Sequence, residues 1–327
     1  MTAKKIVTVV MLLLLASPLA LGQRKAGINS ATFLKVGAGA RSVAMGSAVT
    51  TLRGDVEQMF HNPAGMTMEG MRLQASFSHA NWLAGIKHTV GGVCYNWEGI
   101  GTVGVGLIMF GENDIPATRD PFNDPSTSTS FNYMDMAVQL SFARYVTDRL
   151  SLGITAKMIN ETIDDLSASA FAFDVGSLYD IGLLNWRVGA RLSNVGSDIK
   201  YYDYSSSIPI TFSMGTSIMP LNTEDQKWLM AVDVVKQQDY IAYFNLGMEY
   251  TALNLLTVRA GYKLNYSDMQ DPGRTNRNPI QTTIEGWSVG GGIHTTVSDL
   301  ELRVDYAFTD MQILSDVHRF SLQIGWK

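Results

Sequence analysis

The sequence predicts an all-β fold, a transmembrane antiparallel β-barrel of about fourteen strands. Three observations predict it. From about residue 72 onward, apolar and polar side chains alternate with a period of two. Each alternating segment is roughly nine to eleven residues long, which is the length that a tilted strand needs to cross a membrane. The connections between segments alternate between short and long, as they do in barrels of bacterial outer membranes.

The alternation is clear near the C-terminal end of the chain. In the segment near residues 300–308, one face is apolar and the other is charged. The apolar face consists of Leu300, Leu302, Val304 and Tyr306, and the charged face of Glu301, Arg303 and Asp305. A strand with one apolar and one polar face suits a wall between lipid and a wet interior. About fourteen segments follow this pattern, near residues 72–79, 87–97, 100–110, 133–145, 150–159, 171–179, 185–195, 209–219, 228–236, 243–251, 255–264, 286–295, 300–308 and 318–326.

The connections supply an independent test of the barrel. Those after every even-numbered segment are short, about two to eight residues, whereas those near 111–132 and 265–285 exceed about twenty. Composition alone fits a soluble β-protein equally well, but a soluble sandwich has no reason to sort its loops in this way. The sorting favours an outer-membrane barrel with short periplasmic turns and long extracellular loops. No segment after residue 22 approaches the roughly eighteen apolar residues of a spanning helix.

Aromatic side chains gather at the predicted periplasmic ends of the strands, on the apolar face. Rings at this depth form the girdle that barrels place at the lipid headgroups. The six residues concerned are Trp97, Tyr179, Trp186, Trp228, Tyr250 and Trp326.

The predicted inner face mixes both signs of charge. Because buried charges are costly unless they are paired or wet, an even mixture indicates a cross-linked, partly hydrated interior. A charged substrate path is the alternative, which the mixture favours less. The residues are Asp135, Asp174, Asp233, Glu249, Glu301 and Asp305, with Lys157, Arg187, Arg191, Arg259, Lys263 and Arg303.

The first 22 residues have the features of a signal peptide. Lys4 and Lys5 precede the apolar run 6–16, and Ala20-Leu21-Gly22 offers the small residues that a signal peptidase reads. The run is too short to span a bilayer, so cleavage before Gln23 is expected, with an uncleaved membrane anchor as the alternative. We therefore expect export to the cell outer membrane.

Charge and cysteine content exclude other classes. Without the two lysines of the signal peptide, 23 basic residues face 30 acidic ones, a net charge of −7. So acidic a chain gives no electrostatic reason to expect nucleic acid as a partner. The single cysteine, Cys94, has no partner for an internal disulfide.

Residues 23–71 lack the period of two and are rich in glycine and small residues, which indicates turns and close backbone approach. We expect this segment to plug the lumen, between a signal peptide (1–22) and the barrel (72–327). Irregular backbone at membrane depth is tolerated there, because wall side chains and water can satisfy it. Arg41, Asp55 and Asn62 are expected to hold the plug, with Arg41 binding a wall carboxylate through two hydrogen bonds.

Residues of the N-terminal segment and of several later segments resemble those of a known family. Residues 33–46, Asp55 and Asn62-Pro63-Ala64 are similar to the N-terminal signature of PorV/PorQ outer-membrane proteins. The resemblance continues in 148–157, 173–176 and 189–209, and one departure is His61, where the family usually has Trp. It implies a fourteen-stranded barrel like that of FadL transporters, in which Arg41, Asp55, Asn62 and Pro63 belong to an N-terminal hatch. It also implies an association with type IX secretion.

Signals for an enzyme are weak. Residues 99–104 spell G-x-G-x-x-G, but no helical pattern follows, so a glycine-rich strand pair is the better interpretation. There is no serine elbow and no H-E-x-x-H motif, and the five histidines have no metal-binding spacing. We expect a protein that is not an enzyme and has no cofactor or metal.

The predicted extracellular loops suggest contacts with other proteins. Tyr201, Tyr202, Tyr204 and Tyr266 lie among small polar residues, a composition typical of adaptable contact surfaces. We therefore expect an accessory component of type IX-like secretion that docks a secretion-machinery barrel or secreted cargo. The alternative is a FadL-like channel for uptake of hydrophobic small molecules, which would need an apolar groove at its outer mouth.

The last segment has an apolar face that ends in an aromatic residue, a pattern that barrel-assembly machinery recognises. Replacing its last residue or deleting 318–327 is expected to leave an open strand edge, which hydrocarbon does not tolerate. Outer-membrane lipid and the assembly machinery are thus expected partners. The face consists of Phe320, Leu322, Ile324 and Trp326.

Overall fold

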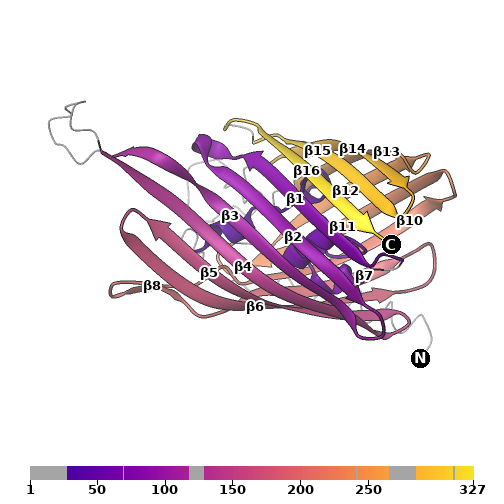
Figure 1. Cartoon of the computed structure of the whole chain (residues 1–327), viewed down its shortest axis with the longest axis horizontal. Helices are drawn as coiled ribbons and strands as arrows, with labels where there is room; N and C mark the ends of the chain where they lie inside the picture. Colours follow the sequence, from indigo (N-terminus) through magenta and orange to yellow (C-terminus); the bar gives the residue numbers. More distant parts are fainter. Residues whose placement is uncertain (1–27, 69, 118–128, 241, 265–284, 312–313) are drawn as a thin grey trace, which may run out of the picture.

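In the computed structural model, fourteen strands close into a single antiparallel barrel, as the sequence predicts (Figure 1). The structure describes residues 28–68, 70–117, 129–240, 242–264, 285–311 and 314–327. The strands are β1 (Leu73–Asn81), β2 (Lys87–Trp97), β3 (Gly101–Ala117), β4 (Thr129–Thr147), β5 (Leu150–Ile163), β6 (Leu166–Asp180), β7 (Arg187–Gly196), β10 (Thr211–Asn222), β11 (Gln226–Gln237), β12 (Tyr243–Ala252), β13 (Leu256–Leu264), β14 (Trp287–Val297), β15 (Leu300–Thr309) and β16 (Val317–Trp326).

Each strand pairs with its neighbours along the chain, and β1 pairs with β16 to close the ring. The closing register sets Leu73 opposite Trp326, so the last segment of the sequence completes the wall. A separate hairpin, β8 (Ile199–Tyr201) with β9 (Tyr204–Ser206), stands on the extracellular connection between β7 and β10. The last described residue, Lys327, lies at the end of the barrel that the sequence predicts to be periplasmic. The start of the chain lies outside the described residues.

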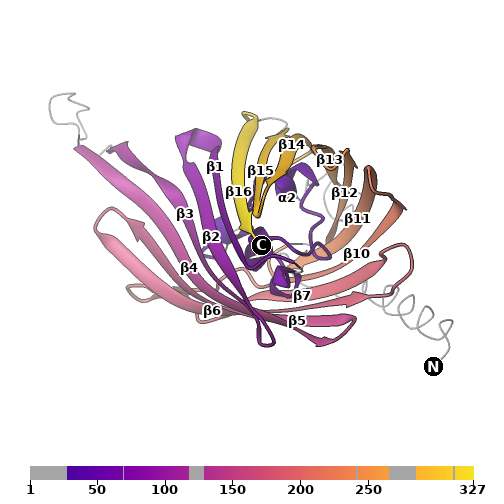
Figure 2. The same ribbon diagram turned by 45° about the vertical axis from the view of Figure 1, so that its right-hand side comes forward.

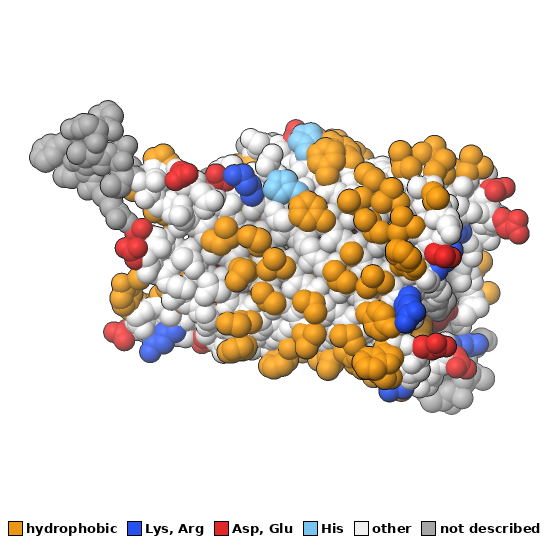
Figure 3. All heavy atoms as spheres, viewed as in Figure 1, with side chains coloured by type: hydrophobic (Ala, Val, Ile, Leu, Met, Phe, Trp, Pro, Cys, Tyr) orange, Lys and Arg blue, Asp and Glu red, His pale blue; other side chains and the backbone are white. Residues whose placement is uncertain are grey.

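The outer surface is apolar because every second side chain points outward. Along β16, the outward Phe320, Leu322, Ile324 and Trp326 are exposed, whereas the residues between them are buried. Figure 3 shows apolar side chains over the middle of the wall, with acidic and basic side chains toward the two ends. Trp97, Tyr179, Trp228 and Trp326 are exposed at the periplasmic rim, where the girdle is predicted. Among the described residues, no helix is long and apolar enough to cross a membrane.

The prediction of long loops at one end is wrong in part. The predicted connection 111–132 is mostly strand, because β3 continues to Ala117 and β4 begins at Thr129, leaving 118–128 outside the described residues. The β5–β6 connection is a two-residue turn at residues 164–165. Strands that rise beyond the membrane meet water on both faces, so their side chains no longer alternate in polarity. The predicted loop 265–285 lies almost entirely outside the described residues.

The N-terminal segment, residues 28–71, lies inside the ring of strands (Figure 2). It consists of short turns: η2 (Thr32–Lys35), α2 (Ala40–Ala44), η3 (Val56–Phe60) and η4 (Pro63–Met66). Wall glycines allow its backbone to approach closely. A Cβ atom at Gly176 of β6 would overlap Asn62 Oδ1, and one at Gly261 of β13 would overlap the backbone of Gly46. These glycines therefore make room for the segment.

Candidate functional site

The lumen differs between its two halves. In the extracellular half, most inward positions of β2 to β6 are apolar, with His88, Asp135 and Glu161 among them, whereas inward positions nearer the periplasm are mainly polar or glycine. We call this lining the apolar chamber. It consists of Val90, Ile108, Phe110, Ala137, Ile159, Ala168, Ala170 and Ala172. A barrel built only to hold water would have no reason to line one side of its interior in this way.

The N-terminal segment fills the apolar chamber. Phe33, only 1% exposed, stacks on Phe110 with ring centroids 6.4 Å apart, and Leu34 and Val36 pack against the same cluster. Ile199 and Ile208, from the connection between β7 and β10, pack into the same apolar cluster. Side chains of this size keep the chamber dry and occupy the volume that an apolar ligand would need.

Few polar contacts hold this part of the segment. The backbone N–H of Ala31 donates to Glu161 Oε1 at 2.6 Å, and that of Ser30 donates to the Ser207 carbonyl at 3.1 Å. Lys35 Nζ pairs with Asp239 at 2.5 Å. The contacts lie at the extracellular end of the barrel, so residues 30–36 are attached mainly by apolar packing.

Deeper in the lumen, a charge network joins the segment to the wall. Arg41 donates two hydrogen bonds to Glu249 of β12, both 2.8 Å long, and a third of 3.1 Å to Asp55. Arg303 Nη2 of β15 donates to Asp55 at 2.5 Å, and Arg259 of β13 pairs with Glu249 at 2.6 Å. Arg41 thus forms the two-bond contact with a wall carboxylate for which an arginine is suited.

Asn62 and Pro63 lie against a different part of the wall. The Asn62 side chain accepts from the Ala64 N–H at 3.2 Å and donates to the carbonyls of Thr50 and Ser177 at 2.6 and 3.2 Å. Pro63 begins η4 and packs against β5. The structure therefore brings Arg41 and Asp55 together, whereas Asn62 and Pro63 form a second attachment at β5 and β6.

Two carboxyl groups of the segment have opposite electrostatic environments. Burial alone would raise the pKa of Asp55, but the Arg303 and Arg41 guanidiniums hold it well below its usual range. Burial raises the pKa of Glu57 to about 8, and the Asp55 charge adds to this effect. Asp55 is thus ionised at neutral pH, whereas Glu57 is largely protonated.

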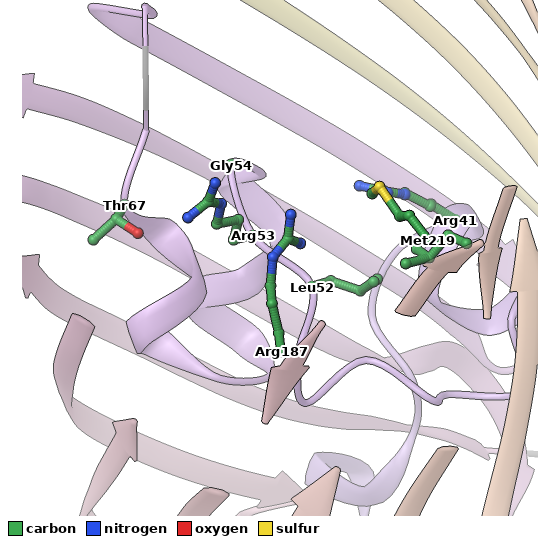
Figure 4. A pocket seen from close by; sticks show the side chains of 8 residues that line it. Arg41, Leu52, Arg53, Gly54, Thr67, Arg187 and Met219 are labelled. Carbon is green, nitrogen blue, oxygen red and sulfur yellow. The ribbon is translucent and has the colours of Figure 1, made fainter. Parts of the chain in front are cut away.

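A cavity of about 200 Å³ lies toward the periplasmic end of the lumen. Figure 4 shows Arg53 of the N-terminal segment and Arg187 of β7 next to each other in its wall. Arg53 Nη1 donates to the Tyr145 hydroxyl at 2.9 Å. The cavity is lined by Arg41, Leu52, Arg53, Gly54, Thr67, Arg187, Met219 and Leu229.

Three of the four predicted loop tyrosines lie in the described residues, and these three do not share one surface. The Tyr201 hydroxyl turns inward to Glu161, with its oxygen 3.4 Å from the carboxylate, while Tyr202 and Tyr204 are exposed at the tip of the β8–β9 hairpin. Tyr266 lies outside the described residues. The apolar chamber was missed from the sequence, because its residues alternate like those of any other strand. Among the described residues, no group of three or more His, Cys, Asp and Glu side chains is arranged to hold a metal ion.

The closed barrel with its apolar outer surface and filled lumen defines the class of protein: an outer-membrane β-barrel of the FadL-like fold. The toluene transporter TbuX of Ralstonia pickettii is similar over 89% of this chain and 99% of its own, with 13% identity and a TM-score of 0.58. The toluene transporter TodX of Pseudomonas putida is similar over 89% and 97%, with 11% identity and a TM-score of 0.57. A FadL homologue of Pseudomonas aeruginosa is similar over 88% and 97%, with 12% identity and a TM-score of 0.53.

At these identities the likeness concerns the fold alone. No protein-family model matches the chain, and no curated protein matches its sequence. The resemblance to PorV/PorQ proteins has therefore no support from the comparisons.

Proposed function

We propose that the protein is an outer-membrane channel through which hydrophobic small molecules enter the cell, the alternative considered from the sequence. The observation that carries the proposal is the apolar chamber in the extracellular half of the lumen. Proteins of similar fold are described as toluene transporters, which supports the same class of substrate. The polar loops do not argue against this function, because the chamber lies below them, inside the barrel.

In this proposal, the N-terminal segment acts as a hatch. An apolar ligand that takes the place of Phe33, Leu34 and Val36 buries about as much apolar surface as those side chains did. Because burial contributes roughly 25 cal/mol per Å² for the ligand and for the displaced side chains alike, the exchange of one for the other is close to neutral in free energy. The charge network around Arg41 is the firmer attachment and stays in place, so residues 30–38 move and the rest of the segment does not.

A role in secretion, which the PorV/PorQ resemblance implies, is a second candidate. The observation that favours it is the β8–β9 hairpin, where Tyr202 and Tyr204 are 77% and 84% exposed. Exposed tyrosines offer rigid contact area to a translocon barrel or to cargo. The second candidate predicts that a large barrel or a secreted protein co-purifies with this one, and that replacing both tyrosines by serine removes it.

Uptake by intact cells tests the channel. Ala170 lines the chamber on β6, and its neighbour Phe171 points outward to lipid. Ala170→Trp is expected to fill the chamber and to abolish uptake of radiolabelled naphthalene by cells that express the protein. Phe171→Trp, present in equal amount in the outer membrane, serves as the control and keeps it. Equal uptake by the two variants would contradict the proposed path.

A further inference from the structure

The cavity at the periplasmic end of the lumen has positively charged side chains in its wall. Arg41, Arg53 and Arg187 line it, and among the described residues no Asp or Glu does. In Figure 4 the Arg53 and Arg187 guanidiniums lie next to each other, one on the N-terminal segment and the other on the first residue of β7. Because like charges repel each other most where little water screens them, this arrangement favours an anion between them. We call this space the arginine cavity.

Arg41 belongs to a closed ring of charges that is balanced in itself. Each arginine of the ring contacts two carboxylates, and each carboxylate contacts two arginines. The ring consists of Arg41, Glu249, Arg259, Asp305, Arg303 and Asp55. Since the positive and negative charges of the ring are equal in number, its carboxylates do not compensate Arg187 on the other side of the cavity.

Arg187 is buried without a hydrogen bond at its Nε atom. The residue is 8% exposed, and in the described part of the chain this nitrogen has no hydrogen-bond partner. Its one ion pair among the described residues is a contact of 3.9 Å with Asp180 Oδ2, which is too long for a hydrogen bond. The same oxygen also lies 3.9 Å from Arg53 Nη1. A buried charged donor without an acceptor is costly, so the geometry at Arg187 is that of a site for an acceptor.

The arginine cavity is separate from the apolar chamber. The two share no lining residue, and they lie in opposite halves of the lumen. A volume of about 200 Å³ holds a compact anion together with water. A ligand of the arginine cavity is therefore recognised by its charge and its hydrogen bonds, and it needs no apolar part.

We propose that the arginine cavity binds a compact inorganic oxyanion of the phosphate type, which enters from the periplasm. The planar guanidinium of Arg187 offers parallel N–H donors that match two oxygens of such an anion, and Arg53 contributes a second positive group. The bound anion connects the hatch, through Arg53, to the wall at β7, and so fixes the deep part of the hatch. This inference goes beyond the proposed channel, whose ligands occupy the other half of the lumen.

Calorimetric titration of the purified full-length barrel in detergent tests the site, with phosphate and chloride as probes at equal ionic strength. One phosphate per barrel is expected to bind, and chloride is expected not to compete. Arg187→Gln should weaken phosphate binding about tenfold or more, because it removes both the charge and the paired donors. The matched control is Arg149→Gln in the turn between β4 and β5, which removes the same charge from an exposed position outside the cavity lining and should change nothing.

Arg53→Gln is the second variant, because it changes the hatch and leaves every wall residue in place. It too is expected to weaken phosphate binding about tenfold or more. Limited proteolysis gives an independent readout of the connection between hatch and wall. Phosphate should slow cleavage within residues 50–56 of the natural protein and of Arg149→Gln, and should have no such effect on Arg187→Gln.

Three results would overturn the proposal, and none of them bears on uptake through the apolar chamber. The first is the absence of phosphate binding, or equal binding by the natural protein, Arg187→Gln and Arg53→Gln. The second is equal competition by chloride, which would reveal an adventitious ion only. The third is phosphate binding that leaves cleavage within residues 50–56 unchanged, because the anion would then not connect the hatch to β7.

Discussion

At the scale of single residues, Arg41 shows why its type matters. Arg41→Lys keeps the charge but cannot form both bonds to Glu249 and the third to Asp55. We expect a loss of about 1–3 kcal/mol in the free energy of unfolding, measured by urea titration in detergent. Arg72→Lys is the matched control, because the Arg72 side chain is exposed and its guanidinium donates to the Tyr95 hydroxyl and to no carboxylate among the described residues. An equal loss in both variants would contradict the role of the charge network.

Glu57 predicts a dependence of stability on pH. Its pKa rises from 4.5 to about 8 on folding, so between these values the folded state binds the proton more tightly than the unfolded chain does. The contribution of Glu57 to stability is present at low pH and is lost as pH rises through about 8. Asp55, Arg303, Asp305 and Arg41 are the charged groups that act on the Glu57 carboxyl.

Glu57→Gln is therefore expected to lose less stability than the natural protein between about pH 7 and about pH 9. His61, whose pKa burial and the Arg191 charge lower to about 4, titrates below this window in both states. Parallel curves of unfolding temperature against pH for the two proteins would contradict the assignment of this pH dependence to Glu57.

Arg319 of β16 shows the limit of sequence analysis at this scale, because it is 1% exposed and, among the described residues, its guanidinium nitrogens have no hydrogen-bond partner. Simple alternation places Arg319 on the inner face of the last segment, just as it places six other basic residues on the inner faces of their own segments. The alternation does not show whether Arg319 has a partner. That depends on β1, β2 and the N-terminal segment, which are far from β16 in the sequence. His88 was passed over for the same reason.

At the scale of elements, the wall glycines determine how the N-terminal segment packs. Gly176→Ala introduces a Cβ that overlaps Asn62 Oδ1. We expect a loss of about 1–3 kcal/mol in stability and faster proteolysis within residues 50–66. Gly291→Ala on the outer face is the control, because its Cβ would lie 3.6 Å from the Thr257 carbonyl, an ordinary contact. Unchanged proteolysis of Gly176→Ala would mean that Asn62 is not held at β6.

The strands were predictable because lipid on one side and a polar lumen on the other impose a period of two. All fourteen predicted segments overlap the observed strands. Their extracellular ends were not predictable: in residues 112–117 and 129–132, both faces are wet, and the alternation that marks a strand disappears. The β5–β6 turn was misplaced for the same reason.

At the scale of the whole molecule, the lumen combines two environments. Charged pairs hold the hatch to β12 and β15, and apolar packing holds its residues 31–36 to β2 to β6. An even mixture of interior charges was predicted from the sequence, and the structure pairs Lys157 with Asp174 and Arg259 with Glu249 and Asp305. The apolar chamber emerges only when five strands and residues 31–38 come together, so no local pattern shows it.

The central claim is that residues 30–38 must leave the apolar chamber for hydrophobic molecules to pass. A reversible crosslink tests it most directly. The Ser30 N–H donates to the Ser207 carbonyl at 3.1 Å, so the two backbones are adjacent, and cysteines are introduced at both positions to form a disulfide that fixes the hatch. The buried Cys94 stays in place, and the single Ser207→Cys variant is the control. Naphthalene uptake by the double variant should be blocked when oxidised and should recover on reduction. Equal uptake in both states would contradict a movable hatch.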